Sequence, residues 1–162
     1  MKKWLWIGAV ALMLTACGTE ETFETISDEP VQAVSAEMRE IFLSLPPEAV
    51  SPVLESPERS IYICGDYEIY QQTLEAGDLA ETVETVSGFD LEDLTVMETR
   101  QGEMTRYEFV WASAGETGDR LGRAAILDDG HYHYCLSVLG DAETAGEHRL
   151  VWQDLFASFT LI

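Results

Sequence analysis

Two histidines on one expected strand could bind a metal ion together. His131 and His133 are two positions apart, and such residues point to the same face of a strand. If Asp129 and Gly130 form a two-residue turn, Asp128 lies opposite His131 on that face, and two imidazoles with a carboxylate suit zinc or iron. The alternative is that the acidic pair and the glycine only form the turn, with both histidines on the outer side of the strand. We favour this alternative, because such patterns are common by chance, and predict no metal or other cofactor.

Cys64 and Cys135 are the two cysteines that follow the N-terminal region. Both lie in strand-like runs, so neither resembles a reactive thiol at an open helix start. Outside the cell a disulfide between them is chemically allowed. Two buried thiols would pack equally well as small apolar side chains, so the sequence leaves both possibilities open. The absence of a CxxC motif argues against a redox site or a cysteine-rich zinc site.

No residue pattern predicts a catalytic site. A Ser-His-Asp triad is assembled in space, but the chain has only three histidines, and no G-x-S-x-G turn accompanies His148 and Asp141. The 30 acidic residues do not single out a pair for glycoside hydrolysis. No glycine-rich phosphate loop or EF-hand spacing is present. We therefore predict a protein that is not an enzyme, with an envelope hydrolase as the least favoured alternative.

The first sixteen residues have the pattern of a secretory signal peptide. Two lysines precede an apolar run over residues 4–14, which is shorter than the roughly 20 residues that span a bilayer. The run ends in LTAC at residues 14–17, which resembles the lipobox of bacterial lipoproteins. In that family the cysteine, here Cys17, is diacylated with fatty acids such as palmitate and becomes the first mature residue. The resemblance implies a protein anchored by lipid on the extracytoplasmic face of the cell envelope. The alternative is an ordinary signal peptide with an accidental cysteine.

The composition describes one acidic domain behind a short tether. Residues 17–29 are polar and acidic and form the expected tether, and residues 30–162 have the length of a single domain with its own core. The formal net charge of −21 repels phosphate backbones and anionic lipid headgroups. Nucleic acid is therefore excluded as a partner. We expect contact with the membrane through the lipid, and an envelope protein or small ligand as the partner.

Hydrophobic periodicity predicts three helices. The first follows Pro30 and ends before Pro46, because apolar residues recur at spacings of three, four and seven. Its apolar face consists of Val31, Val34, Met38, Ile41, Phe42 and Leu45. The second is capped by Asp78 and stops at Gly88. The third covers residues 147–156.

Between these helices apolar residues recur at every second position, which is typical of strands, and turn residues join these strands into three hairpins. Their turns are Gly65-Asp66, Gln101-Gly102 and Asp129-Gly130. The expected strands are residues 61–64, 67–70, 94–98, 105–111, 122–127 and 132–138. Most of the expected strands come in hairpins, and single helices are inserted between them. This arrangement predicts an α+β fold with a central antiparallel meander sheet of about six strands.

Several aromatic residues lie on the expected strands. Tyr107, Phe109 and Trp111 share one face, which we expect to be a core face. A set of five could instead line a cleft: Tyr62, Tyr70, Tyr107, Trp111 and Trp152. Strand aromatics are more often part of a core, so we favour the core interpretation.

Three phrases together resemble proteins of the PsbP-like fold, many of which are small bacterial lipoproteins. They are RYEFVW at residues 106–111, LDDG at 127–130 with tyrosines at 132 and 134, and FASF at 156–159. The resemblance covers residues 62–161 and rests on turn and core positions. It implies a central antiparallel sheet flanked by helices, and a binding or assembly role. We therefore expect a membrane-anchored lipoprotein with a non-enzymatic binding or accessory function, and a metal-binding accessory protein using His131 and His133 as the alternative.

Overall fold

The computed structural model describes residues 37–115 and 118–162, which belong to one compact unit, Ser35–Ile162. The expected signal peptide, Cys17, the tether and the start of the first predicted helix lie outside the described residues. Of the helices in the described part, none is long and apolar enough to cross a membrane.

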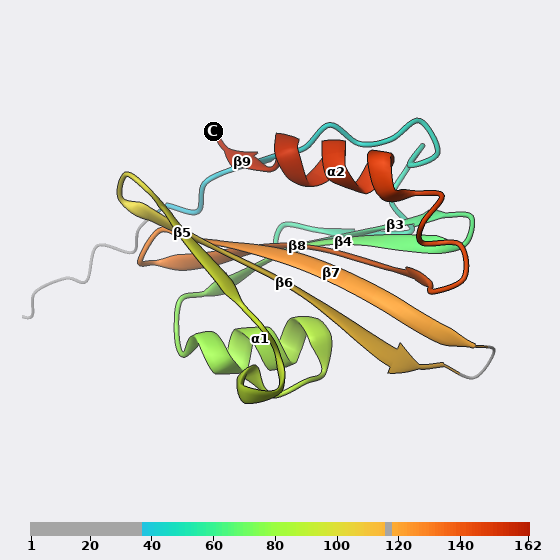
Figure 1. Cartoon of the computed structure of the whole chain (residues 1–162). Helices are drawn as coiled ribbons and strands as arrows, with labels where there is room; N and C mark the ends of the chain where they lie inside the picture. The colour runs from blue at the N-terminus through green and yellow to red at the C-terminus, as the bar shows by residue number, and fades with distance from the viewer. Residues whose placement is uncertain (1–36, 116–117) are drawn as a thin grey trace, which may run out of the picture. The chain divides into compact units, whose positions relative to one another are not determined.

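A seven-stranded sheet forms the centre of this unit (Figure 1). Its strands are β2 (Leu54–Ser56), β3 (Arg59–Cys64), β4 (Tyr67–Glu75), β5 (Met97–Gln101), β6 (Met104–Ala114), β7 (Asp119–Asp128) and β8 (Tyr132–Asp141). The order is β2-β3-β4-β8-β7-β6-β5, and every neighbouring pair is antiparallel. The predicted antiparallel α+β class is confirmed. The strand number is seven rather than six, and the meander is interrupted where β4 pairs with β8.

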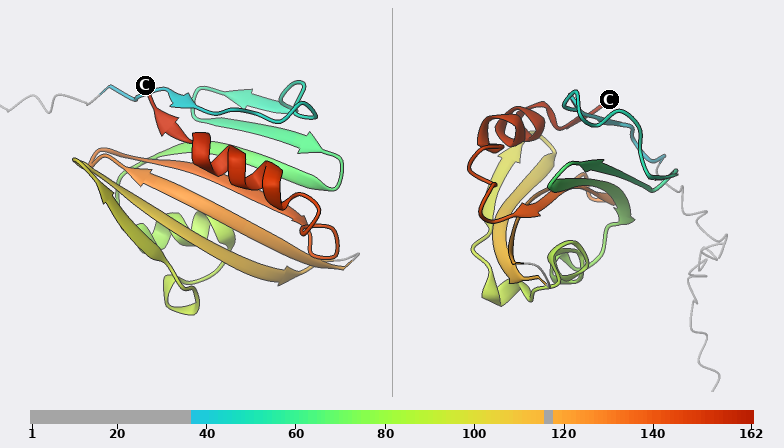
Figure 2. Two further views of the ribbon diagram at one scale, coloured as in Figure 1. Left: turned by 45° about the horizontal axis from the view of Figure 1, so that its top comes forward. Right: turned by 90° about the vertical axis from the view of Figure 1, so that its right-hand side faces the viewer.

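Helices cover both faces of this sheet. Helix α1 (Leu79–Ser87) and the short 3-10 helix η1 (Leu91–Asp93) follow β4, and α2 (Arg149–Ser158) follows β8. The sheet curves around α1, while α2 lies on the opposite face (Figures 1 and 2). Buried side chains therefore form two cores. We call them the α1-side core, around Val83, and the α2-side core, around Phe156.

Helix α1 begins and ends as the sequence predicts. The Asp78 carboxylate accepts a hydrogen bond from the Ala80 backbone N–H at 2.9 Å, which satisfies a donor that the first turn leaves free. Gly88 takes the left-handed conformation with φ 77°, and its N–H donates to the Glu84 carbonyl. Together these two residues set the length of the helix.

The first predicted helix is wrong over its described part. Residues 37–40 are irregular, and Ile41–Phe42 form the strand β1, which pairs with β9 (Thr160–Leu161). The apolar residues of this stretch also fit a period of two: Ile41, Leu43 and Leu45 pack against the α2-side core, and the residues between them are exposed. The apolar residues are compatible with a helix and with a strand, and pairing with β9 stabilises the extended conformation.

Backbone hydrogen bonds explain why this segment is extended. The Arg39 N–H donates to the Tyr134 hydroxyl at 2.9 Å, and the Ser44 N–H donates to the Ser158 hydroxyl at 2.9 Å. A helix would direct these donors to its own carbonyls. Tertiary acceptors from β8 and α2 replace that pattern, and none of them is visible in the local sequence.

The β3–β4 and β5–β6 turns each have a glycine as the first central residue. Gly65 has φ 72° between the paired residues Cys64 and Tyr67, as predicted. The β5–β6 turn differs from the prediction by one residue, because Gln101 pairs with Met104 and the central residues are Gly102 and Glu103. Gly102 has φ 67°, and only glycine adopts this conformation readily. The glycine therefore determines which residue opens the turn.

Trp111 lies flat against β7 because its strand partner is Gly122. A Cβ atom at position 122 would lie 2.1 Å from Cε2 of Trp111. We expect Gly122→Ala to lower the free energy of unfolding by about 3 kcal/mol, since the indole is largely buried and must move. Urea unfolding measures this loss. Gly77→Ala is the matched control, because a Cβ there meets nothing within 4 Å, and unchanged stability of both variants would contradict the prediction.

A charged network ties the end of α2 to the sheet. Arg106 on β6 donates from Nε to Glu108 at 2.6 Å and from its terminal nitrogens to the carbonyls of Phe156 at 2.9 Å and Phe159 at 3.3 Å. Arg123 on β7 donates to the second Glu108 oxygen at 3.1 Å. The guanidinium of Arg106 therefore satisfies carbonyls that the end of a helix leaves free.

We expect Glu108 to make stability depend on pH. Burial alone raises the pKa of its carboxyl, but hydrogen bonds and charge from Arg106 and Arg123 outweigh burial and hold the pKa below its ordinary value. A carboxyl whose pKa is lower in the folded than in the unfolded state stabilises the folded protein at neutral pH. This contribution is lost as the pH falls through the folded-state pKa. In urea unfolding, Glu108→Gln should therefore be less stable than the wild type at pH 7, with a smaller difference at pH 3. A difference that does not change with pH would contradict this, and Glu103→Gln, an exposed neighbour, is the control.

Candidate functional site

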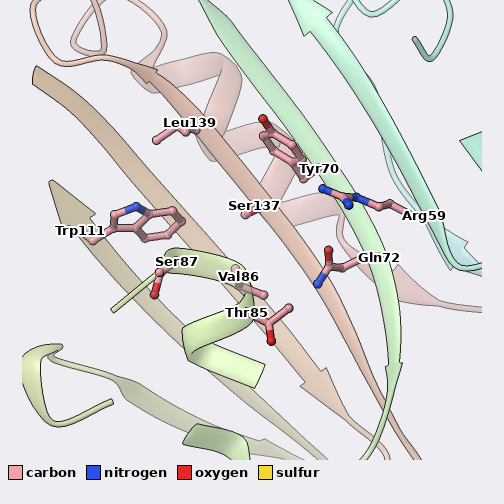
Figure 3. Close-up of a pocket in the computed structure, with 10 residues that line it drawn as sticks. Arg59, Tyr70, Gln72, Thr85, Val86, Ser87, Trp111, Ser137 and Leu139 are labelled. Atoms are coloured by element: carbon pink, nitrogen blue, oxygen red, sulfur yellow. The ribbon is translucent and has the colours of Figure 1, made fainter. Parts of the chain in front are cut away.

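A pocket of 290 Å³ lies between the sheet and the C-terminal end of α1, and we call it the helix-end pocket (Figure 3). Helix α1 stops at Gly88, which itself lines the pocket, so the helix does not cover this part of the sheet. The residues that line the pocket are Arg59, Tyr70, Gln72, Thr85, Val86, Ser87, Gly88, Trp111, Ser137 and Leu139.

Strand register brings the polar lining residues together. Arg59 on β3 pairs with Gln72 on β4, and Tyr70, two positions from Gln72, pairs with Ser137 on β8. Residues two apart on a strand share a face, so all four project from the face that α1 partly covers. Trp111 reaches the same face from β6, on the other side of Ser137 (Figure 3).

Three of these groups have free hydrogen-bonding capacity. Within the described residues, the side chains of Gln72 and Ser137 have no hydrogen-bond partner, although Ser137 is only 7% exposed. The Arg59 guanidinium makes no ion pair among the same residues and lies 5.9 Å from the centre of the Tyr70 ring. Arg59 is exposed, Gln72 is half-buried and Ser137 keeps a small exposed surface, so all three side chains are accessible to a ligand.

Tyr70 is held in place as a neutral donor. Its hydroxyl donates to a carboxylate oxygen of Glu68, and the same carboxylate lies 3.9 Å from the guanidinium of Arg120. Burial, followed by the bond to Glu68, raises the pKa of Tyr70 to about 12. The phenol therefore keeps its proton at neutral pH, and its ring forms a fixed wall.

The five aromatic residues separate into different environments. Tyr70 and Trp111 line the helix-end pocket, while Tyr107 packs against the α1-side core. Tyr62 and Trp152 pack in or against the α2-side core. The predicted core face of Tyr107, Phe109 and Trp111 is confirmed, with Phe109 and Trp111 buried. Arg59, Gln72 and Ser137 were not identified from the sequence; the one available signal was Ser137, a serine between Leu136 and Val138 on β8.

The expected pairing of Asp128 with His131 is wrong. Asp128 pairs with His133, because residues 129–132 all lie between the paired ends of β7 and β8. The Asp129 carboxylate accepts hydrogen bonds from the backbone N–H groups of His131 and Tyr132, which stabilises this longer connection. His131 is exposed in the turn.

His133 is buried under α1 rather than on an outer side of the strand. It is 2% exposed, and its Nδ1 lies 2.7 Å from the Thr82 hydroxyl of α1. Its Nε2 lies 3.8 Å from Asp128. Among the residues that the structure describes, no three His, Cys, Asp or Glu side chains are arranged to hold a metal ion. His133 therefore connects β8 to α1.

Cys64 and Cys135 are free and buried on opposite faces of the sheet, so the possible disulfide is not formed. Cys64 belongs to the α2-side core and Cys135 to the α1-side core. Burial raises the pKa of both thiols, to about 12 for Cys135. Both therefore remain protonated and pack as small side chains.

His148 has a different partner from the one considered in the sequence. Its Nε2 lies 2.9 Å from Asp66 in the β3–β4 turn, while Asp141 lies 3.6 Å from Arg120. The Thr144 hydroxyl donates to the second oxygen of Asp66, and hydrogen bonds from Thr144 and then His148 lower the pKa of Asp66. No serine is hydrogen-bonded to His148 within the described part, so the cluster attaches the turn to the start of α2.

Comparison with known proteins finds no matching family model and no similar curated protein.

Proposed function

We propose that this chain is an exported lipoprotein, anchored through lipid on Cys17, whose domain binds a small ligand in the helix-end pocket without catalysis. The pocket supports this proposal, because it exposes unpartnered hydrogen-bonding groups beside an aromatic wall. Ligand sites commonly combine a few such polar groups with apolar walls.

The arrangement of side chains favours binding over catalysis. All three histidines are described by the structure, and none lines the pocket. No carboxylate lines it either, so Ser137 has no neighbouring base to activate its hydroxyl. A hydrogen-bonding pocket without a base suits recognition of a ligand.

The PsbP-like assignment is part of the same proposal. Its support is an antiparallel sheet with a helix on each face, most of which comes from the region that carries the resemblance, residues 62–161. Binding and accessory roles are what that resemblance implies. The anchor would place the pocket on the extracytoplasmic side of the cell envelope.

Activity assays test the non-enzymatic part directly. Full-length protein in detergent, mixed with chromogenic esters, glycosides and peptides, should release no more product than a mock preparation from cells that lack the protein. Turnover above this background that disappears in Ser137→Ala or His148→Ala would overturn the proposal.

A further inference from the structure

The helix-end pocket has a single charged side chain, and it is positive. None of the ten lining residues is acidic, although the chain has 30 acidic residues. Arg106, Arg120 and Arg123 each pair with a carboxylate of the protein, whereas Arg59 makes no ion pair within the described residues. A guanidinium with free N–H donors can bind a carboxylate through two parallel hydrogen bonds.

Two further donors line the same pocket. Gln72 is the strand partner of Arg59, and Ser137, the strand partner of Tyr70, lies between Tyr70 and Trp111 (Figure 3). On the same faces of β4 and β8, the neighbouring residues Leu74 and Cys135 belong to or pack against the α1-side core. A carboxylate at Arg59 would be an acceptor for the side-chain amide of Gln72, which has no partner within the described residues.

The opposite wall is flat and apolar. The Trp111 indole lies against β7 at Gly122, and Val86 and Leu139 complete the wall. A volume of 290 Å³ is at the small end of ligand pockets, which are about 300–1,000 Å³. The pocket therefore suits a small ligand with a flat apolar body.

From these features the geometry points to a small carboxylate with a flat apolar body, bound with its carboxylate at Arg59 and its body against Trp111. This inference rests on the proposed function. The position of the carboxylate follows from charge: the C-terminal end of α1 carries partial negative charge, and Arg59 is the positive group in the lining. Glu68, which lies on the same face of β4 as Tyr70 but does not line the pocket, is hydrogen-bonded by that tyrosine and lies close to Arg120.

Three probes of similar shape test the class of ligand: benzoate, its neutral amide benzamide, and the cation benzylamine. Each is titrated into the full-length protein in detergent, with calorimetry and tryptophan fluorescence as readouts. We expect benzoate to bind about tenfold or more tightly than benzamide, because charge-assisted hydrogen bonds to Arg59 are made only by the anion. Arg59→Gln should remove this difference by weakening benzoate about tenfold while leaving benzamide unchanged.

Arg100→Gln is the matched control, because it removes the same charge from an exposed residue of β5 outside the pocket lining. Its benzoate affinity should equal that of the wild type. Equal binding of benzoate and benzamide, benzoate binding that Arg59→Gln does not change, or no binding of any probe would overturn the inference. A preference for benzylamine would also overturn it but would leave the binding function in place, whereas catalytic turnover would overturn that function alone.

Discussion

Replacing Cys17 by serine should leave the protein unacylated and uncleaved. Under the proposed lipoprotein assignment the anchor would depend on one sulfur, because the lipobox resemblance implies that the lipid is attached through a thioether. A hydroxyl at this position cannot form that bond. Intact-mass spectrometry and incorporation of labelled palmitate should show a precursor that keeps residues 1–16 and carries no lipid. Two acyl chains anchor a protein stably, so the wild type should remain with the membrane fraction.

A neighbouring substitution controls for general effects on export. Thr19→Ala changes a residue just beyond the lipobox and should be cleaved, acylated and retained like the wild type. If Cys17→Ser is matured to the same size and retained at the membrane, the lipoprotein assignment fails. The ligand-binding proposal would survive that result, because it depends on residues 59–139 and not on the anchor.

Replacing Arg106 by methionine should cost about 3 kcal/mol of unfolding free energy, which would be a large fraction of the stability of one domain. The side chain is 12% exposed and joins β6 to two carbonyls at the end of α2 and to Glu108. Methionine keeps much of the apolar stem but removes every donor and the guanidinium, whose carbon lies 5.6 Å from the centre of the Phe159 ring. The carbonyls of Phe156 and Phe159 then lose these partners inside a largely buried contact.

Urea unfolding of three variants separates the charge from the geometry. Arg106→Lys keeps the positive charge but lacks the planar guanidinium. Its free energy of unfolding should therefore lie between the values of the wild type and of Arg106→Met. Arg100→Met removes an exposed arginine of the neighbouring strand and should change stability by less than about 0.5 kcal/mol. A loss below about 1 kcal/mol for Arg106→Met would show that the network does not hold α2 on the sheet.

Much of the fold could be predicted from residues close together in the chain. Asp78 and Gly88 set the limits of α1, and Gly65 opens the β3–β4 turn, because capping and positive φ are local requirements. The segment at residues 41–45 could not be predicted in the same way. Its apolar residues fit both periods, and the strand β9, at the far end of the chain, decides between them.

The candidate site depended almost wholly on tertiary structure. The β4–β8 pairing joins two hairpins distant in sequence, and without it Ser137 would not lie beside Tyr70 and the strand partners Arg59 and Gln72. Strand pairing also separated residues that the sequence placed together. The longer β7–β8 connection changed the register of His131 and His133, and His133 is buried under α1. The strand partner of Asp128 moved by two residues, from His131 to His133, and His131 was left exposed in the connection. Motifs on strands therefore carry little information before the pairing is known.

By itself, the sequence determined the acidic character of this protein, its antiparallel α+β class and the local signals that start and stop α1. Those properties depend on composition and on interactions between residues within a few positions of each other. Only the tertiary structure decided that both faces of the sheet are covered, that Cys64 and Cys135 lie apart, and that a pocket with one free arginine opens at the end of α1. These outcomes follow from which strands pair and in which register, and that choice is made by the packing of the whole domain.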